Sequence, residues 1–117
     1  MNLIDELRGL GVDVEEGVER VMGDHSLYEM MLGMFIESVN SSQVRVEDFE
    51  KESLEGLIDR IHMLKGVTGN LAMTPLFARY TEVLGKLRSG QPEEAKAGFE
   101  GLLPIQEEII NCITRYQ

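Results

Sequence analysis

The stretch that decides the fold runs from Leu54 to Leu71 and reads LEGLIDRIHMLKGVTGNL. Its apolar residues recur at steps of three and four, which is the spacing of one face of an α-helix. The spacing therefore predicts an amphipathic helix. The positions on its apolar face are Leu54, Leu57, Ile58, Ile61, Leu64, Thr68 and Leu71.

One polar side chain of this helix, His62, lies roughly 115° from the centre of the apolar face at about 100° per residue. We therefore expect it at the rim or on the surface. Its neighbours at i+3, i+4 and i+7 are Lys65, Gly66 and Gly69, and each glycine costs a helix up to about 1 kcal/mol relative to alanine. Spacing alone leaves two explanations open. Either the glycines let a partner approach an exposed imidazole beside a positive charge, or they permit a close helix crossing next to an ordinary surface histidine.

Helix signals also precede this stretch, and Ser53 is a plausible cap for the stretch itself. Asp13 with Glu16 three residues on has the form of a capping box for a short helix that ends at Gly23. Asp24 or Ser26 can cap a longer helix. We expect that helix to continue through residues 40–42 to residue 49, with a kink at the weak helix formers Asn40-Ser41-Ser42.

Two further helices follow. Thr74-Pro75 predicts a helix start, because proline suits the first turn and threonine can bond the free amides there. A last helix is expected from Pro92 to Tyr116, with a kink or interruption at Pro104. No segment has the alternation of a strand.

Every linker is short, so neighbouring helices should run antiparallel. The fold class expected is all-α: an antiparallel up-down four-helix bundle with a short extra N-terminal helix, forming a single domain over residues 1–117. A chain of this length with 43% hydrophobic residues suits one core. The seven methionines are interpreted as core filler.

The N-terminus lacks a basic region before an apolar stretch, and no segment has the length of a membrane span. The single cysteine, Cys112, cannot form an intrachain disulfide and is expected to pack at the flank of the last helix. Both features favour a cytoplasmic protein without a membrane partner.

The net charge of -10 is unevenly distributed. Residues 1–60 hold 15 acidic and 5 basic side chains, whereas residues 61–117 hold 6 of each. From Arg60 to Pro92 the basic residues face Glu82 alone, which gives a local charge of +4. Such a segment favours phosphoryl groups or an acidic partner, although it could simply be a solvated face, and the total charge opposes nucleic acid binding. Its basic residues are Arg60, Lys65, Arg79, Lys86 and Arg88.

Other chemistries fit poorly. Asp59 and His62 have the i, i+3 spacing of half a carboxylate-bridged metal site, but the only other histidine, His25, has Met22 three residues before it. His25, next to Asp24, is interpreted as a solvated turn residue. No serine or cysteine lies in a recognisable catalytic setting, and no phosphate-binding loop is present, so we expect neither a bound metal nor an ATP site.

The residues His62-Met63-Leu64-Lys65-Gly66, followed by Gly69-Asn70-Leu71, resemble the phosphoacceptor signature of the histidine phosphotransfer (HPt) domain family, roughly His-x-Leu-Lys-Gly-x-x-x-x-Leu-Gly. The resemblance covers most of the chain from about Gly11 onward.

The resemblance implies a phosphorelay intermediate of two-component signalling and not an enzyme in its own right. His62 would accept a phosphoryl group from the aspartate of a receiver domain and pass it on. Lys65 would offset charge on the phosphoryl oxygens, and Gly66 and Gly69 would leave room for the partner. Met63, Arg88 and side chains of the long second helix would contribute to docking. The implied partners are a response regulator receiver domain, which would supply Mg²⁺, and a hybrid sensor histidine kinase.

The chain departs from the family pattern at two positions. Ala72 replaces the glycine that usually follows the motif leucine. Where the family often has a Glu or Gln that holds the imidazole, the next helix has Val83 and Leu84, with Glu82 beside them. The loss of that polar group keeps one alternative open, a non-catalytic interaction module of the same fold. Another, the phosphoacceptor part of a larger sensor histidine kinase, is disfavoured by the starting Met1 and the absence of linker sequence.

Overall fold

The computed structural model describes residues 2–117, and every regular element in them is a helix. The predicted all-α class is therefore confirmed. None of the helices from Asn2 onward combines the length and apolarity needed to cross a membrane. The elements are α1 (Leu3–Gly9), α2 (Val14–Arg20), α3 (His25–Ser42), the 3₁₀ helix η1 (Val46–Glu50), α4 (Glu55–Asn70), α5 (Thr74–Arg88) and α6 (Pro92–Arg115).

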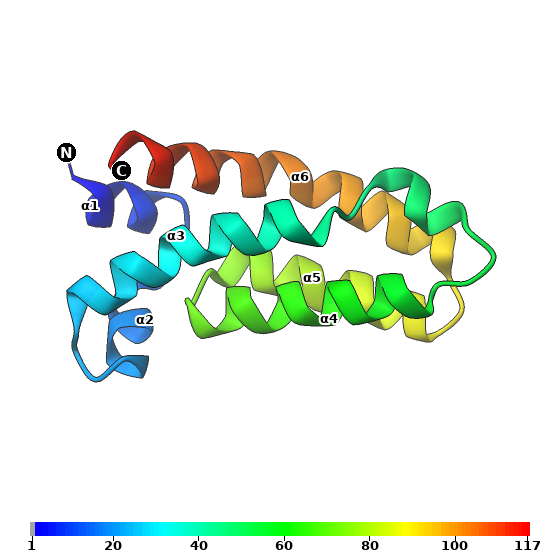
Figure 1. Ribbon diagram of the computed structural model, residues 1–117, viewed down its shortest axis with the longest axis horizontal. Coiled ribbons are helices and arrows are strands. Elements are labelled where there is room, and N and C mark those ends of the chain that lie inside the picture. The colour runs from blue at the N-terminus through cyan, green and yellow to red at the C-terminus, as the bar shows by residue number, and fades with distance from the viewer. Residues whose placement is uncertain (1) are drawn as a thin grey trace.

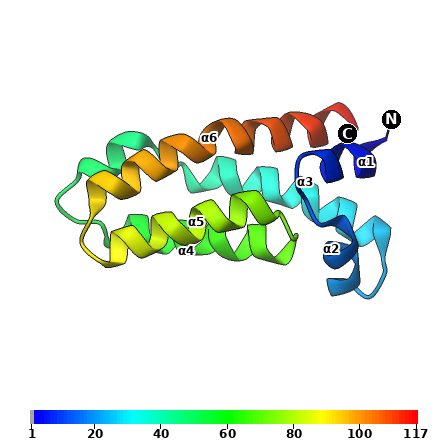
Figure 2. The same cartoon turned by 180° about the vertical axis from the view of Figure 1, so that it is seen from behind.

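The four long helices lie along the long axis of a molecule measuring 44 × 25 × 22 Å (Figure 1). Helix α5 packs against both α4 and α6, and α3 lies beside α4. Seen from behind, α1 lies against the C-terminal end of α6, and α2 lies at the same end of the molecule (Figure 2). The short extra helix predicted after Asp13 is thus α2, which ends at Arg20 instead of Gly23, and a further short helix, α1, precedes it.

A core of large apolar side chains joins the helices. Tyr28 of α3 is fully buried, and its hydroxyl donates a 3.0 Å hydrogen bond to the carbonyl of Leu71 at the end of α4. Burial raises the pKa of Tyr28 to about 12, so this donor keeps its proton at neutral pH. Other side chains with less than 2% exposure include Phe35, Leu7, Leu32, Ile61, Leu64, Met73, Leu76, Tyr80 and Leu102.

Carboxylates cap the two helices on either side of the first long turn. Asp13 accepts a hydrogen bond from the amide of Glu16 at 3.2 Å, and Asp24 accepts one from the amide of Leu27 at 3.0 Å. Of the two caps considered for α3, Asp24 is the one that forms. His25 is then the first helical residue, and its side chain is exposed.

Two other predicted caps are wrong. Helix α4 begins after Leu54 without any side-chain cap, so Ser53 lies one position too early. At the start of α5, the Thr74 hydroxyl donates to the carbonyl of Ala72 at 3.4 Å instead of bonding the free amides. Pro75 does lie in the first turn as expected, where its missing N–H leaves no partner unsatisfied.

The long second helix does not continue with a kink to residue 49. Helix α3 ends at Ser42, and Gln43 takes a left-handed conformation with φ of 49°. The chain then forms η1 and returns toward α4. The weak helix formers at residues 40–42 thus end the helix, because a left-handed residue cannot continue it.

Pro104 does not interrupt the last helix, which runs unbroken from Pro92 to Arg115. A proline removes the bond to the carbonyl four residues earlier, which here belongs to Glu100. Both residues are exposed, so water can reach the free carbonyl. The predicted interruption is wrong for this reason.

An Arg60-centred network holds the returning chain against α4. The Arg60 guanidinium donates to the carbonyls of Ser42 and Gln43 at 3.1 and 3.4 Å and to the Asp48 carboxylate at 3.4 Å. Asp48, which is 6% exposed, also accepts from the amide of Arg45 and pairs with Lys51 at 2.9 Å. The hydrogen bond from Lys51 is the main reason that the pKa of Asp48 is lowered. This network fixes the helix that carries His62.

The C-terminal end of α4 is closed by two backbone bonds. The amide of Met73 donates to the carbonyl of Thr68 at 3.0 Å, and the amide of Ala72 donates to that of Gly69 at 3.1 Å. This is the pattern of a Schellman motif, which requires a left-handed residue after the cap. Ala72 fills that position with φ of 55°. The departure from glycine at residue 72 therefore places a side chain in a strained, left-handed backbone conformation.

Candidate functional site

His62 lies in the middle of α4, on the face turned away from the core. Its neighbours Ile61 and Leu64 are 0% and 1% exposed, whereas the His62 side chain is exposed. The surface position expected from the helix spacing is confirmed. In the part of the chain that the structure describes, the imidazole makes no hydrogen bond and no ion pair. Both ring nitrogens are thus free to meet a group from outside.

The two glycines beside His62 do different things. A Cβ atom built on Gly66 would meet nothing within 4 Å. One built on Gly69 would come within 2.9 Å of two ring carbons of Phe77. Gly69 therefore permits a close crossing of α4 and α5, whereas Gly66 leaves open space one turn from the imidazole. The explanation by a close helix crossing is therefore confirmed for Gly69 and does not apply to Gly66, where the surface is open.

Phe77 of α5 is part of this face, and the sequence analysis did not identify it. Its ring covers Gly69 and remains 37% exposed. A hollow of about 380 Å³ opens beside it, between α2, α4 and α5. The face that carries His62 therefore continues into an open depression with an aromatic wall. The residues that line the hollow are Glu16, Arg20, Gly66, Gly69, Asn70, Ala72, Thr74 and Phe77.

No polar side chain of α5 holds the imidazole. Val83 and Leu84 are 1% and 2% exposed and lie in the core, and Glu82 is exposed without an ion pair. Residues one and two turns after Phe77 on the same face are Thr81 and Gly85. The Thr81 hydroxyl donates to the carbonyl of Phe77 and is already used. Within residues 2–117, no side chain thus replaces the Glu or Gln that often holds the imidazole in the family.

Ion pairs with acidic residues offset part of the charge of +4 that the sequence gives to residues 60–92. Arg60 is engaged with Asp48, and Lys86 forms a 3.0 Å ion pair with Glu94. Arg79 lies over α6, since its guanidinium is 3.6 Å from a Cβ built on Gly101. Within residues 2–117, the basic residues of this segment that form no ion pair are Lys65, Arg79 and Arg88, and Lys65 lies three residues after His62.

Arg88 edges the same face at its other end. It is exposed and stands 11 residues after Phe77, which is about 16 Å along a helix. Because α5 returns along α4 and Phe77 meets Gly69, Arg88 lies nearly level with Asp59. Lys65 and Arg88 therefore lie on opposite sides of His62 along the helix axis.

Met63, for which the family resemblance implies a role in docking, is 37% exposed beside His62. The wider interpretation of the methionines as core filler is wrong, because Met22, Met30 and Met34 are 97%, 61% and 55% exposed. Only Met73 is fully buried among those in residues 2–117. The signal was available, since apolar residues cover more of α3 than one face can bury.

The surface formed by His62, Lys65, Gly66, Gly69 and Phe77, called the histidine face below, lacks the ligands of a metal site. Across residues 2–117 no group of three or more His, Cys, Asp and Glu side chains could hold a metal ion. Asp59 and His62 have no second pair facing them. Cys112 is buried, and burial raises the pKa of its thiol, so it is a packing residue at neutral pH.

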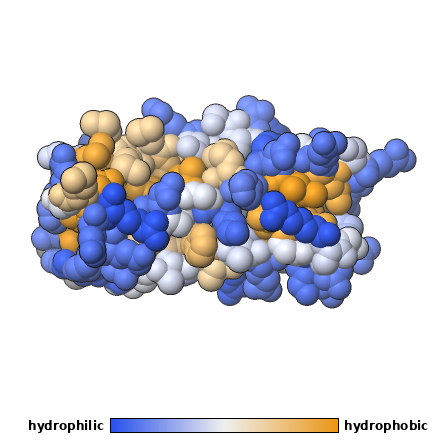
Figure 3. Space-filling model, turned by 90° about the horizontal axis from the view of Figure 1, so that it is seen from below, coloured by the Kyte–Doolittle hydropathy of each residue, from blue (hydrophilic) through white to orange (hydrophobic). Residues whose placement is uncertain are grey.

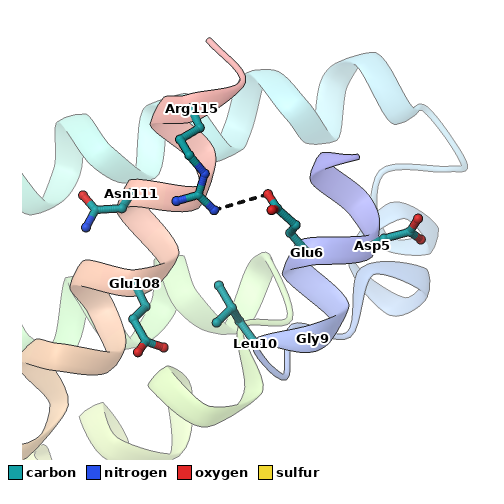
Figure 4. Close-up of a pocket in the computed structure, with 7 residues that line it drawn as sticks. All are labelled: Asp5, Glu6, Gly9, Leu10, Glu108, Asn111 and Arg115. Carbon is teal, nitrogen blue, oxygen red and sulfur yellow. Dashed lines mark hydrogen bonds and ion pairs between the residues drawn. The ribbon is translucent and has the colours of Figure 1, made fainter. Parts of the chain in front are cut away.

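A second hollow, of about 410 Å³, lies far from His62 between α1 and α6 (Figure 4). Two of its charged residues, Glu6 and Arg115, pair with each other across it at 3.3 Å. Asp5 pairs with Arg8 at 3.1 Å. The hydrogen bond from Tyr116 is the main reason that the pKa of Glu6 is lowered. The hollow is thus part of the interface between α1 and α6.

Comparison with protein-family models, with curated proteins and with solved structures found no match to this chain.

Proposed function

We propose that this protein is a histidine-containing phosphotransfer protein that relays a phosphoryl group between receiver-domain aspartates through His62. The observation that carries the proposal is the exposed, unpartnered imidazole with bare Gly66 one turn away and unpaired Lys65 beside it. A histidine that stabilises the fold would be expected to form hydrogen bonds from its ring nitrogens to neighbouring residues. A histidine that accepts a phosphoryl group has to keep one ring nitrogen free of such bonds.

The proposed reaction needs little from the protein beyond position and charge. A nitrogen of His62 bonds to phosphorus as the bond between phosphorus and the aspartyl oxygen of the donor breaks, and the aspartate leaves as a carboxylate. A neutral imidazole is nucleophilic near neutral pH. Lys65 offsets the negative charge of the phosphoryl oxygens. The receiver supplies Mg²⁺, and the return step runs the same exchange in reverse.

The surroundings suit a docked receiver domain. Met63 beside His62 and the ring of Phe77 at Gly69, two turns along α4, would provide apolar contact, and the open space at Gly66 would admit the edge of an acidic pocket. Lys65 and Arg88 favour that acidic pocket electrostatically. In this proposal α3 to α6 form the antiparallel up-down four-helix bundle of the HPt family, with α1 and α2 added at one end. A cytoplasmic location and a hybrid sensor histidine kinase as the phosphoryl source follow from the same proposal.

The test is transfer from a panel of phosphorylated receiver domains, or from a hybrid kinase with ATP. Wild-type protein should gain an acid-labile, alkali-stable phosphate, and Lys65→Ala should gain it about 10 to 100 times more slowly without losing thermal stability. A large fall in thermal stability of Lys65→Ala would instead show that Lys65 is structural.

The absence of a partner for the imidazole supports one competing function. Without a Glu or Gln to hold the second nitrogen, the bundle could serve as an interaction module that binds receiver domains and carries no phosphate. Receivers that bind wild-type protein but leave it unlabelled would favour this second function.

A further inference from the structure

Helix α1 is held to the rest of the molecule by few contacts. Within Leu3–Gly9 only Leu7 is buried, and a helix of seven residues does not persist in water on its own. Its ion pair with α2, between Arg8 and Glu15, joins exposed side chains and contributes little to stability. Apolar side chains also reach the surface at the end of the molecule that carries α2 and the first half of α3 (Figure 3), where Met22 is 97% exposed. This end of the molecule therefore buries its apolar residues less completely.

Hollows lie on two sides of α1. One of about 410 Å³ lies between α6 and the second half of the helix (Figure 4). Another of about 300 Å³ is lined by Asn2 and Leu3 and, opposite them, by residues of α3 and α6. A Cβ atom built on Gly9 would meet nothing within 4 Å. Packing of α1 is therefore limited to the side that carries Leu3, Ile4 and Leu7, so detaching the helix would uncover little apolar surface.

The Glu6 side chain joins α1 to the C-terminal end of α6. Its carboxylate accepts a hydrogen bond from the Arg115 guanidinium at 3.3 Å and one from the Cys112 thiol at 3.7 Å. It also accepts one from Tyr116, which is the main reason that the pKa of Glu6 is lowered. We call these four residues the Glu6 network. Because Cys112 is 0% exposed, Glu6 is part of what covers its thiol.

The chain after α1 has a flexible residue followed by fixed ones. Gly11 has φ of 88°, a left-handed conformation that glycine adopts without strain. The next two residues are held in place, since Val12 is 3% exposed and the amide of Asp13 donates to the carbonyl of Ala72 at 2.9 Å. A rotation at Gly11 can therefore move α1 without moving the end of α4.

We propose that α1 is a hinged helix, which detaches from α6 as a unit by rotation at Gly11 while the long helices stay folded. Elements with few buried side chains open at a much lower free energy than the whole domain. The closed helix thus controls access to the C-terminal end of α6, far from His62, and the inference does not rest on phosphotransfer. Cys112, the single cysteine of the chain, reports the opening, because Glu6 lies over its thiol only while α1 is closed.

The test follows the reaction of Cys112 with dithiobis(nitrobenzoate) in native wild-type protein. The thiolate attacks the disulfide of the reagent, a mixed disulfide forms, and coloured thionitrobenzoate leaves. Because the buried thiol has to be exposed first, the rate measures the population of the open state. The rate should change little in low concentrations of urea, since detaching α1 exposes little surface. By hydrogen exchange, the amides of α1 should exchange about 100 times faster or more than those of Cys112 and Ile61.

Matched variants separate the opening of α1 from unfolding of the whole domain. Leu7→Ala removes the buried side chain of α1 and should speed the labelling of Cys112 about tenfold or more. Leu57→Ala makes the same change at a position of α4 that is 2% exposed, and should speed labelling less than about twofold although it destabilises the domain.

A second pair of variants tests the Glu6 network. Glu6→Gln keeps the size of the side chain, weakens its hydrogen bonds and should speed labelling about threefold. Glu107→Gln, at an exposed position of α6, changes the net charge equally and should leave the rate unchanged. Glu6→Gln leaves every buried apolar side chain in place, so it decides the matter if Leu7→Ala does not fold.

A labelling rate that rises with urea as steeply as global unfolding, or equal acceleration by Leu7→Ala and Leu57→Ala, would overturn the proposal. If Leu7→Ala does not fold, equal rates for Glu6→Gln and Glu107→Gln would do the same. Amides of α6 that exchange as fast as the thiol reacts would overturn it in favour of fraying of α6. A rate that depends on protein concentration would overturn it in favour of exchange of α1 between two copies of the chain.

Discussion

Arg60 and His62 stand two residues apart on α4, and their side chains have opposite fates. The Arg60 guanidinium and its Nε donate to Gly56, Ser42, Gln43 and Asp48. Within residues 2–117 the His62 imidazole bonds to nothing. Both are basic side chains in the same segment of sequence. One anchors the chain that returns from α3, and the other is left for an outside group.

Helix α4 therefore stabilises the fold through Arg60 on one side and carries the proposed phosphoacceptor, His62, on another. Residues two apart on a helix are about 200° apart around its axis, so they face different neighbours. The Arg60 side faces the turn through η1, where a buried carboxylate needs cations. The His62 side faces solvent. The charge that the sequence assigns to a single basic patch is thus divided between a structural network and an open face.

The largest effect on stability should separate these two sides. Arg60→Ala leaves Asp48 with one fewer cation and frees two carbonyls, so the free energy of unfolding should fall by about 2 kcal/mol. His62→Ala should change it by less than about 0.5 kcal/mol. Urea denaturation of the two variants at pH 7 measures both. Equal losses would mean that His62 also supports the fold.

The second prediction concerns acid. Because the pKa of Asp48 is lowered in the folded state, its contribution is present above the unfolded pKa of about 4 and is lost as pH falls through the folded value. Asp48→Asn should therefore lower the free energy of unfolding by about 1 to 2 kcal/mol at pH 7 and by less at pH 3. Glu47→Gln, an exposed neighbour in η1, is the control and should cost little at either pH. A constant difference for Asp48→Asn would show that its charge is irrelevant.

The two glycines of the histidine face give the third prediction. Gly66→Ala should raise the free energy of unfolding by up to about 1 kcal/mol, because the space is open and alanine favours the helix. Gly69→Ala should show no gain, since its Cβ has to displace the Phe77 ring. Only the first substitution narrows the open side of His62, so Gly66→Ala should also slow phosphotransfer. Thermal unfolding would contradict the account if the two variants were equally stabilised.

The smallest effect is expected at the end of α4. Ala72→Gly relieves a left-handed backbone conformation and should raise the free energy of unfolding by about 0.5 to 1 kcal/mol. Ala97→Gly, at an exposed position inside α6, should lower it by about 1 kcal/mol. Differential scanning calorimetry of the pair should therefore show melting temperatures that move in opposite directions.

Local sequence patterns predicted the helices well, because three- and four-residue spacing reports directly on burial. They failed where long-range contacts decide. Helix α3 ends at Ser42, before left-handed Gln43, and the carbonyls of both residues accept hydrogen bonds from Arg60; the sequence spacing does not contain that contact. Pro104 continues α6 because the carbonyl that it frees is exposed. Ser53 and Thr74 are good capping residues by type, but the helices begin one position away from where their side chains could cap.

For the candidate site, the sequence predicted the exposure of His62 and the neighbouring Lys65 but not which glycine serves packing. That distinction depends on Phe77, which approaches from another helix. The local charge of +4 also overestimated the free positive charge, because Glu94 pairs with Lys86 and Asp48 pairs with Arg60 from distant segments of the chain. The exposure of the α3 methionines was not predicted, although the apolar residues of α3 cover more of its surface than one face can bury.

If His62 is the phosphoacceptor, it should be the residue that carries phosphate after incubation with a phosphorylated receiver domain. Mass spectrometry of protein kept at alkaline pH should locate one phosphoryl group on His62, with none on His25, which is also exposed but lies outside the histidine face. His25→Gln should be labelled as wild type is, and His62→Gln should remain unlabelled while unfolding at the same temperature as wild type. Label on His25, or label that persists in His62→Gln, would contradict the account.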